Sequence, residues 1–268
     1  MLIGVTGGTG TVGRHVVREL AEAGHGVRVL TRRAPSQMLP GVEHHPVDLA
    51  TGAGLDGALA GTDVVIDAAN RAGTGRQAAR VIVEGTKRLL AAEQRVGVAH
   101  HVAISIVGIE RVPYGYYAAK VAQELAVREG AVPWTIVRAT QFHELLEMAY
   151  SAPARAGLLL VPDIQLQPVD PRHVAQVLAA IAEDEPLNAW EQVAGPRVER
   201  FGDLARIWRT TTGRSALAVP LRLPRRLGRP LAAGALVPQE AVTGGPTFAA
   251  WLRDRAGRLI TAPTAVTT

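Results

Sequence analysis

A glycine-rich turn between an apolar strand and a one-faced helix constrains this chain more than any other feature. Residues 2–5 are apolar, and residues 14–23 place Val16, Val17, Leu20 and Ala21 at helical spacing. The turn between them consists of Thr6, Gly7, Gly8, Thr9, Gly10, Thr11, Val12 and Gly13. Free backbone N–H groups and the positive end of a helix meet at such a turn, where they suit a pyrophosphate. The order of strand, glycine turn and helix therefore predicts a dinucleotide site rather than a merely structural turn.

Short apolar runs alternate with helical patterns along the first 140 residues. The expected strands are residues 27–31, 42–47, 63–68, 101–105 and 134–138, and the expected helices are 53–60, 77–95 and 116–129. Nearly continuous apolar strands separated by helices indicate a parallel sheet covered on both faces. We therefore predict an α/β fold, a Rossmann-type doubly wound parallel sheet.

This rhythm loosens beyond residue 140, where proline also becomes more frequent. Helices are expected at residues 142–150, 173–182 and 201–212, with strands near 164–169 and 191–193. We divide the chain into a dinucleotide-binding Rossmann core (1–150), a smaller C-terminal substrate lobe (151–260) interleaved with the core, and a flexible tail (261–268). The lobe is expected to close over the carboxyl edge of the sheet, where ligands of such folds bind.

Composition excludes several kinds of chemistry. The chain has 268 residues, is 47% hydrophobic and contains no cysteine, which excludes disulfides, thiolate catalysis and thiolate metal sites. Neighbouring histidines in a strand point to opposite faces, so the pairs His44/His45 and His100/His101 predict no metal site. No apolar run has membrane-spanning length, and Met1 is followed at once by a core strand. We therefore expect no signal peptide, no membrane partner and a cytoplasmic location.

The positive charges are scattered, although the formal net charge is +5. Their densest cluster comprises Arg222, Arg225, Arg226 and Arg229. A nucleic-acid surface is one interpretation of this cluster; a solvated helix face or an interface is the favoured one, so no nucleic-acid partner is expected.

A second cofactor motif follows the second expected strand, at Thr31, Arg32 and Arg33. An acidic residue there would bind a ribose 2′-hydroxyl, whereas arginine suits a 2′-phosphate. The motif predicts NADP(H), with NADPH preferred over NADH. At the ends of the next strands, Asp48 and Leu49 are expected near the adenine. Ala68, Ala69 and Asn70 are expected on the nicotinamide side.

The candidate catalytic residues are Tyr116, Lys120 and Ser105. Tyr116 lies four residues before Lys120, on one face of a helix. A lysine ammonium, beside an oxidised nicotinamide, would favour the phenolate and tune the phenol for acid–base work. Lys120 would also hold ribose hydroxyls, and Ser105 would polarise a substrate carbonyl. The alternative for Tyr116 is simple packing under the lysine stem.

These motifs resemble the short-chain dehydrogenase/reductase superfamily, in its atypical branch of nitrogen-metabolite-repressor-like proteins and NADPH quinone reductases. The resemblance rests on the glycine turn, Arg32 and Arg33, Val83 to Thr86, Tyr116 and Lys120, residues 138–143, 167–170 and 245–252, and so runs nearly end to end. It implies that Ala139 and Thr140 contact the cofactor and that Gln141 and Phe142 contact substrate. His143, just past the sixth expected strand, could also face substrate as an auxiliary acid or base, but a solvated or capping role is favoured for it.

We therefore expect an NADPH-dependent oxidoreductase that reduces a small, mostly apolar carbonyl or quinone, as a monomer or homodimer. Two alternatives stay open. One is a non-catalytic, NADP(H)-sensing regulatory protein, and the other is an epimerase or dehydratase that uses the cofactor transiently.

Overall fold

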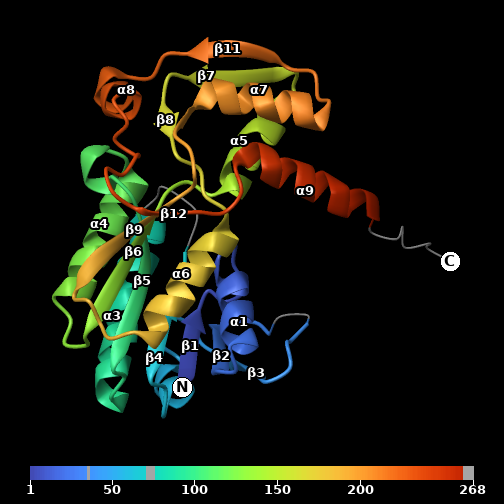
Figure 1. Ribbon diagram of the computed structural model, residues 1–268. Helices are drawn as coiled ribbons and strands as arrows, with labels where there is room; N and C mark the ends of the chain where they lie inside the picture. The colour runs from blue at the N-terminus through green and yellow to red at the C-terminus, as the bar shows by residue number, and fades with distance from the viewer. Residues whose placement is uncertain (35–36, 71–75, 262–268) are drawn as a thin grey trace.

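The computed structural model describes residues 1–34, 37–70 and 76–261, and its main feature is one large parallel sheet (Figure 1). The strands follow the order β12-β9-β6-β5-β4-β1-β2-β3, with every neighbouring pair parallel. They are β1 (Leu2–Thr6), β2 (Gly26–Thr31), β3 (Val42–Pro46), β4 (Val64–Asp67), β5 (His100–Ile106), β6 (Trp134–Ala139), β9 (Ala189–Ala194) and β12 (Val242–Thr243). The predicted Rossmann-type doubly wound sheet is confirmed.

Helices cover both faces of this sheet because its strands carry apolar side chains on both sides. On one face, α1 (Gly13–Glu22) packs against α6 (Pro171–Glu183), over a core that includes Ile3, Val5 and Val174. On the other face lie α2 (Leu55–Leu59), α3 (Arg76–Val96) and α4 (Gly115–Arg128). The short 3₁₀ helix η1 (Ile109–Arg111) precedes α4.

The smaller lobe lies beyond the carboxyl edge of the sheet (Figure 1). Its strands form two small sheets, in which β7 (Leu158–Pro162) pairs with β11 (Leu217–Leu221) and β8 (Gln165–Leu166) pairs with β10 (Glu199–Arg200). Its helices are α5 (His143–Ala154), α7 (Phe201–Thr212), α8 (Arg225–Ala232) and α9 (Phe248–Thr261). The aromatic side chains of Tyr150, Trp208, Phe248 and Trp251 fill its core.

The structure departs from the expected elements mainly in the lobe. The strand expected at 164–169 is reduced to the two residues of β8, and the elements β7, β11 and α8 were not expected. α9 extends to Thr261, the first residue of the expected tail, and residues 262–268 lie outside the described residues. Elements from beyond residue 150, namely α6, β9 and β12, belong to the large sheet and its covering layer. The division at residue 150 stays an interpretation.

Two absences concern the described residues. Within residues 1–34, 37–70 and 76–261, no helix is both long enough and apolar enough to cross a membrane. In the same ranges, no group of three or more His, Asp or Glu side chains is arranged to hold a metal ion.

Candidate functional site

The glycine turn is closely packed at the carboxyl end of β1. Gly7 adopts a φ of 63°, which favours glycine, and the turn is closed by the Gly10 N–H donating to the Gly7 carbonyl over 2.8 Å. A Cβ at Gly13 would lie 2.2 Å from that same carbonyl oxygen. Within the described residues, the N–H groups of Thr11 and Val12 have no hydrogen-bond partner. The turn therefore offers close backbone approach and free donors at a helix start, as a pyrophosphate requires.

The loop after β2 presents two exposed arginines. The Thr31 hydroxyl donates to the Arg33 carbonyl over 2.9 Å, and the His44 ring lies 3.1 Å from the same hydroxyl. Neither Arg32 nor Arg33 has an ion pair in the described part of the chain. These guanidinium groups are thus left to solvent or to an anion.

Asp48 and Leu49 form the next turn along this edge. The Asp48 carboxylate accepts from the Ala50 N–H over 2.9 Å, so it stabilises its own turn. Leu49 packs against α3, where a Cβ on Gly85 would lie 3.2 Å from the Leu49 Cβ. Asp48 and Leu49 therefore lie in the turn that follows β3, and Leu49 lies next to α3.

Asp67 at the end of β4 is the centre of a buried polar network that the sequence did not reveal. One carboxylate oxygen accepts from the Thr6 hydroxyl (2.5 Å) and the Ala69 N–H (3.1 Å). The other accepts from the Thr86 hydroxyl (3.1 Å) and the Gln123 amide (3.2 Å). The network ties the start of the glycine turn to α3 and α4. It also holds the backbone at Ala68 in place. A Cβ on Gly7 would lie only 2.5 Å from the Ala68 carbonyl oxygen and 2.7 Å from its carbonyl carbon.

Lys120 belongs to this network. Its buried ammonium donates to the Ile104 carbonyl over 2.7 Å and to the Gln123 amide oxygen over 2.5 Å. Burial lowers the pKa of Lys120 to about 8, although the negative charges of Asp67 and Glu124 act in the opposite direction. Two of its three donors are thus accounted for within the protein.

Tyr116 and Asn70 meet across the same edge. The Tyr116 phenol donates to the Asn70 side-chain oxygen over 3.0 Å, and burial raises the pKa of this phenol. The rings of Tyr114 and Tyr117 pack beside it with centroids 6.4 and 6.0 Å away. Tyr116 and Lys120 therefore share a helix, but their polar atoms bond to different partners. The catalytic roles assigned to both stay predictions.

Ser105, on β5, contributes an unpartnered hydroxyl. Its side chain is buried, and its Oγ has no hydrogen-bond partner in the described residues. An unpaired buried hydroxyl is costly, so it is expected at a place where a ligand or water supplies the missing bond.

The segment after β6 carries the expected substrate residues. The Thr140 hydroxyl donates to the Gln167 carbonyl over 2.5 Å, so it joins the residue after β6 to the segment between β8 and α6. The Gln141 side chain is only 9% exposed, and both of its amide atoms lack a partner in the described residues. Phe142 immediately precedes α5 and pairs with Val169 through a β-bridge. Ala139 is the last residue of β6 and is buried.

His143 lies deeper than a solvated residue would. Its Nε2 donates to the Pro246 carbonyl over 3.1 Å, and its ring packs against both Phe248 and Trp251. Burial lowers the pKa of His143 to about 4. The ring is therefore neutral near pH 7 and joins α5 to the segment before α9.

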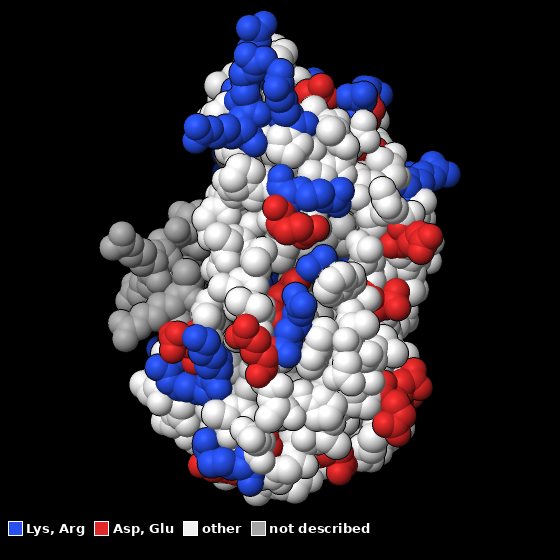
Figure 2. Space-filling view, turned by 90° about the vertical axis from the view of Figure 1, so that its left-hand side faces the viewer, with Lys and Arg blue, Asp and Glu red and all other residues white. Residues whose placement is uncertain are grey.

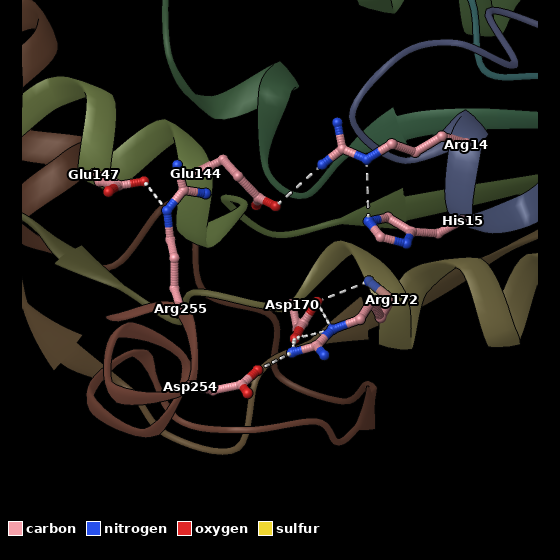
Figure 3. A network of polar contacts seen from close by, with 8 residues as sticks. All are labelled: Arg14, His15, Glu144, Glu147, Asp170, Arg172, Asp254 and Arg255. Atoms are coloured by element: carbon pink, nitrogen blue, oxygen red, sulfur yellow. Dashed lines mark hydrogen bonds and ion pairs between the residues drawn. The ribbon is translucent and has the colours of Figure 1, made fainter. Parts of the chain in front are cut away.

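A second polar network connects the glycine turn to the lobe (Figure 3). Arg14, directly after Gly13, pairs with Glu144 of α5 at 3.8 Å. At the start of α6, Arg172 pairs with Asp170 and, at 3.5 Å, with Asp254 of α9. These ion pairs link α1 to α5, and α6 to α9, at the junction between core and lobe.

Comparison with known proteins identifies the class. A family model described as NAD(P)H-binding matches residues 7–185. The chain belongs to this NAD(P)H-binding family and is an NAD(P)-dependent oxidoreductase. Its fold is that of a short-chain dehydrogenase/reductase superfamily protein, consistent with the atypical branch. The expected resemblance is confirmed.

Individual relatives refine this placement. The chain is 33% identical over 237 residues to a (4-alkanoyl-5-oxo-2,5-dihydrofuran-3-yl)methyl phosphate reductase from Streptomyces griseus, covering 86% of this chain and 75% of that protein. Its fold is similar to a nucleoside-diphosphate-sugar epimerase from Staphylococcus aureus, with a TM-score of 0.78, 16% identity and coverage of 94% and 100% of the two chains. It is also similar to a short-chain dehydrogenase/reductase superfamily protein from Agrobacterium tumefaciens with bound NAD, with a TM-score of 0.75, 21% identity and coverage of 97% and 98%.

Proposed function

We propose that the protein reduces a small, mostly apolar carbonyl compound or quinone with NADPH. The observation that carries this proposal is the hydrogen bond from Tyr116 to Asn70, which follows β4. The unpartnered Ser105 hydroxyl near the end of β5 and the glycine turn after β1 belong to the same carboxyl edge of the sheet. Ligands of open parallel sheets bind at this edge. The name of the Streptomyces griseus relative, a reductase of an alkanoyl- and oxo-substituted compound, supports reduction rather than another reaction.

Each residue has a defined role in this proposal. The glycine turn holds the pyrophosphate, and Lys120 holds the ribose and, through its charge, lowers the cost of forming the Tyr116 phenolate. NADPH, when bound, supplies the hydride. Ser105 orients the carbonyl, and Tyr116 gives its proton to the oxygen that gains negative charge. Before substrate binds, this proton is donated to the Asn70 side-chain oxygen. The Tyr116 O–H must therefore turn from Asn70 to the substrate oxygen before it gives up its proton.

The catalytic proposal is tested with Tyr116→Phe on a panel of carbonyls and quinones. Because general acid catalysis contributes roughly 100-fold or more, kcat/KM for a carbonyl is expected to fall by at least that factor, with NADPH affinity unchanged. Tyr117→Phe is the matched control, since Tyr117 lies on the same helix and its ring packs against the lobe core. Equal turnover by wild type and Tyr116→Phe would remove Tyr116 from the chemistry and favour direct hydride transfer to a quinone.

We further propose that Arg32 and Arg33 select NADPH over NADH. Both are exposed at the end of β2, and charge-assisted hydrogen bonds to a 2′-phosphate contribute roughly 1.5–3 kcal/mol each. Two such bonds predict about 100-fold or tighter binding of NADPH. The double variant Arg32→Ser/Arg33→Ser should lose this preference and keep its NADH affinity, as titration of both cofactors would measure. Equal affinities in the wild type would contradict the assignment.

The fold gives a second candidate, an epimerase or dehydratase that regenerates its cofactor. The observation in its favour is the likeness to the Staphylococcus aureus epimerase along the whole of that chain. This candidate predicts product formation without net consumption of NADPH, whereas the reductase consumes one NADPH for each product.

A further inference from the structure

The lobe ends in a sheet face that is apolar and uncovered. In the parallel pair β7–β11, Leu158 lies opposite Leu217 and Leu160 lies opposite Val219, so these side chains share one face. Leu158, Leu160 and Leu217 are 43%, 49% and 67% exposed, whereas Leu159 on the other face is buried in the lobe core. We call the exposed face, with Leu221, the leucine face. Contiguous exposed apolar side chains of this kind mark interaction sites.

Four arginines adjoin the leucine face. Arg222 directly follows β11, and Arg225, Arg226 and Arg229 lie on α8, the next element along the chain. Leu227 and Leu231 turn inward from α8 and pack against the lobe core, while the arginines are exposed. Positive side chains gather at this end of the molecule (Figure 2). None of the four has an ion pair in the described part of the chain.

We propose that the leucine face and these arginines form a docking surface for an anionic lipid bilayer. The leucines would enter the interface between headgroups and acyl chains, and the guanidinium groups would bind lipid phosphates. Four exposed arginines without ion pairs favour binding to an anionic surface, and exposed leucines favour binding to an apolar one. A bilayer with anionic lipids provides both on one surface. This inference is independent of the proposed reduction. It differs from the expectation of no membrane partner, which rested on the lack of an apolar run of membrane-spanning length.

Two other partners fit the same surface less well. A second copy of the chain meeting this face symmetrically would bring two sets of four arginines into one interface, where like charges repel one another. A nucleic acid would neutralise the arginines but leave the leucine face in water, because its phosphates attract cations only. Both are outcomes of the test below.

The test is sedimentation with vesicles of phosphatidylglycerol and phosphatidylcholine in equal parts, compared with pure phosphatidylcholine. Wild type should bind the anionic vesicles and be released as salt is raised from 50 to 500 mM (on the order of a threefold shorter screening length). Changing Arg225, Arg226 and Arg229 together to Gln should weaken partitioning about 100-fold, since each cation near such a surface is worth roughly a factor of five. Leu158→Thr/Leu160→Thr should weaken it roughly tenfold, with strand propensity retained.

The matched control changes three exposed arginines elsewhere, Arg18, Arg128 and Arg253, to Gln. It alters net charge equally and should bind vesicles much as wild type does. Far-UV circular dichroism and cofactor titration verify that every variant is folded. The proposal is overturned if wild type ignores anionic vesicles, if both triple variants lose binding equally, or if the α8 triple variant binds unchanged. It is also overturned if the leucine face proves to be a dimer contact in sedimentation velocity, or if duplex DNA binds and vesicles do not.

Discussion

At the scale of single residues, the site depends on a buried hydrogen-bond bridge between Asp67 and Lys120, formed by the side-chain amide of Gln123. The Gln123 amide donates to Asp67 with its nitrogen and accepts from Lys120 with its oxygen. Only this orientation of the amide satisfies both charged neighbours. Gln123 is therefore a positioning residue that fixes where the Lys120 ammonium lies.

Lys120 is expected to titrate well below an ordinary lysine. Burial lowers its pKa from 10.5 to about 8, so the folded protein binds fewer protons than the unfolded chain between these two values. Stability should consequently rise with pH across this window, by on the order of 3 kcal/mol from this group. The chain contains only two lysines, Lys87 and Lys120. In NMR of protein carrying ¹³C-lysine, one side-chain signal should therefore titrate with a midpoint near 8, and Lys120→Met should remove it.

A Lys120 midpoint above about 10 would mean that its ammonium is solvated, contrary to its burial here. The variant Gln123→Leu should shift the Lys120 midpoint further down, because it removes an acceptor that favours the charged form.

At the scale of elements, the strand–turn–helix unit of β1 and α1 and the lobe helices α5 and α7 were predictable, whereas the short strands were not. Glycine spacing and a continuous apolar strand define β1 locally. In contrast, β8, β10 and β12 have two residues each, too few for any periodicity to appear. The strand β7 follows Gly157 as a simple apolar run, which periodicity alone does not distinguish from a buried helical turn.

The site residues differ in the same way: some are related by sequence spacing, and others are brought together only by packing. The motif residues Tyr116 and Lys120 are four apart, so sequence spacing places them on one helix face. The partners of Asp67 come from 61, 19 and 56 residues away, in Thr6, Thr86 and Gln123. Such contacts depend on how the helices pack on the sheet. The position of Gln123, three residues after Lys120, was the available indication of a shared face.

Replacing Gly13 by alanine tests the packing of the strand–turn–helix unit. The added Cβ would lie 2.2 Å from the Gly7 carbonyl oxygen, a backbone atom that cannot rotate away. Unfolding in urea should show a loss of about 1–3 kcal/mol, and affinity for NADPH should fall about tenfold or more as the turn shifts.

Gly57→Ala is the control for this substitution. Gly57 lies within α2, and its added Cβ would meet nothing within 4 Å. Alanine there should stabilise the protein by about 0.5–1 kcal/mol and leave cofactor binding unchanged. A Gly13→Ala variant that behaves like Gly57→Ala would contradict the close approach described for the turn.

At the scale of the whole molecule, the chain passes repeatedly between core and lobe. It leaves the sheet after β6 for α5, β7 and β8, returns for α6 and β9, leaves again for β10 to α8, and returns once more for β12 before ending in α9. Ion pairs at the junction, such as Arg14 with Glu144, join the two parts further. The lobe therefore shares its covalent and packing constraints with the sheet.

We expect core and lobe to unfold as one cooperative unit. Trp134 and Trp190 lie on strands of the large sheet, while Trp208 and Trp251 lie in the lobe core. In the variant Trp208→Phe/Trp251→Phe, the remaining tryptophans report on unfolding of the core. In the variant Trp134→Phe/Trp190→Phe, they report on unfolding of the lobe. In each, the urea midpoint from tryptophan fluorescence should coincide with that from far-UV circular dichroism. Separate midpoints in either variant would show that the lobe is an independent folding unit.

The outermost strands of the sheets determine how the protein behaves when it is concentrated. Its two outermost strands, β3 and β12, are poor templates for a further strand, because β12 has only two residues and β3 carries Glu43 and ends in Pro46. In the small sheet, Pro162 and Pro220 likewise remove backbone donors from β7 and β11. Growth of either sheet by addition of strands from other molecules is therefore blocked at its margins, so the folded chain resists fibre formation even with leucines uncovered on its surface.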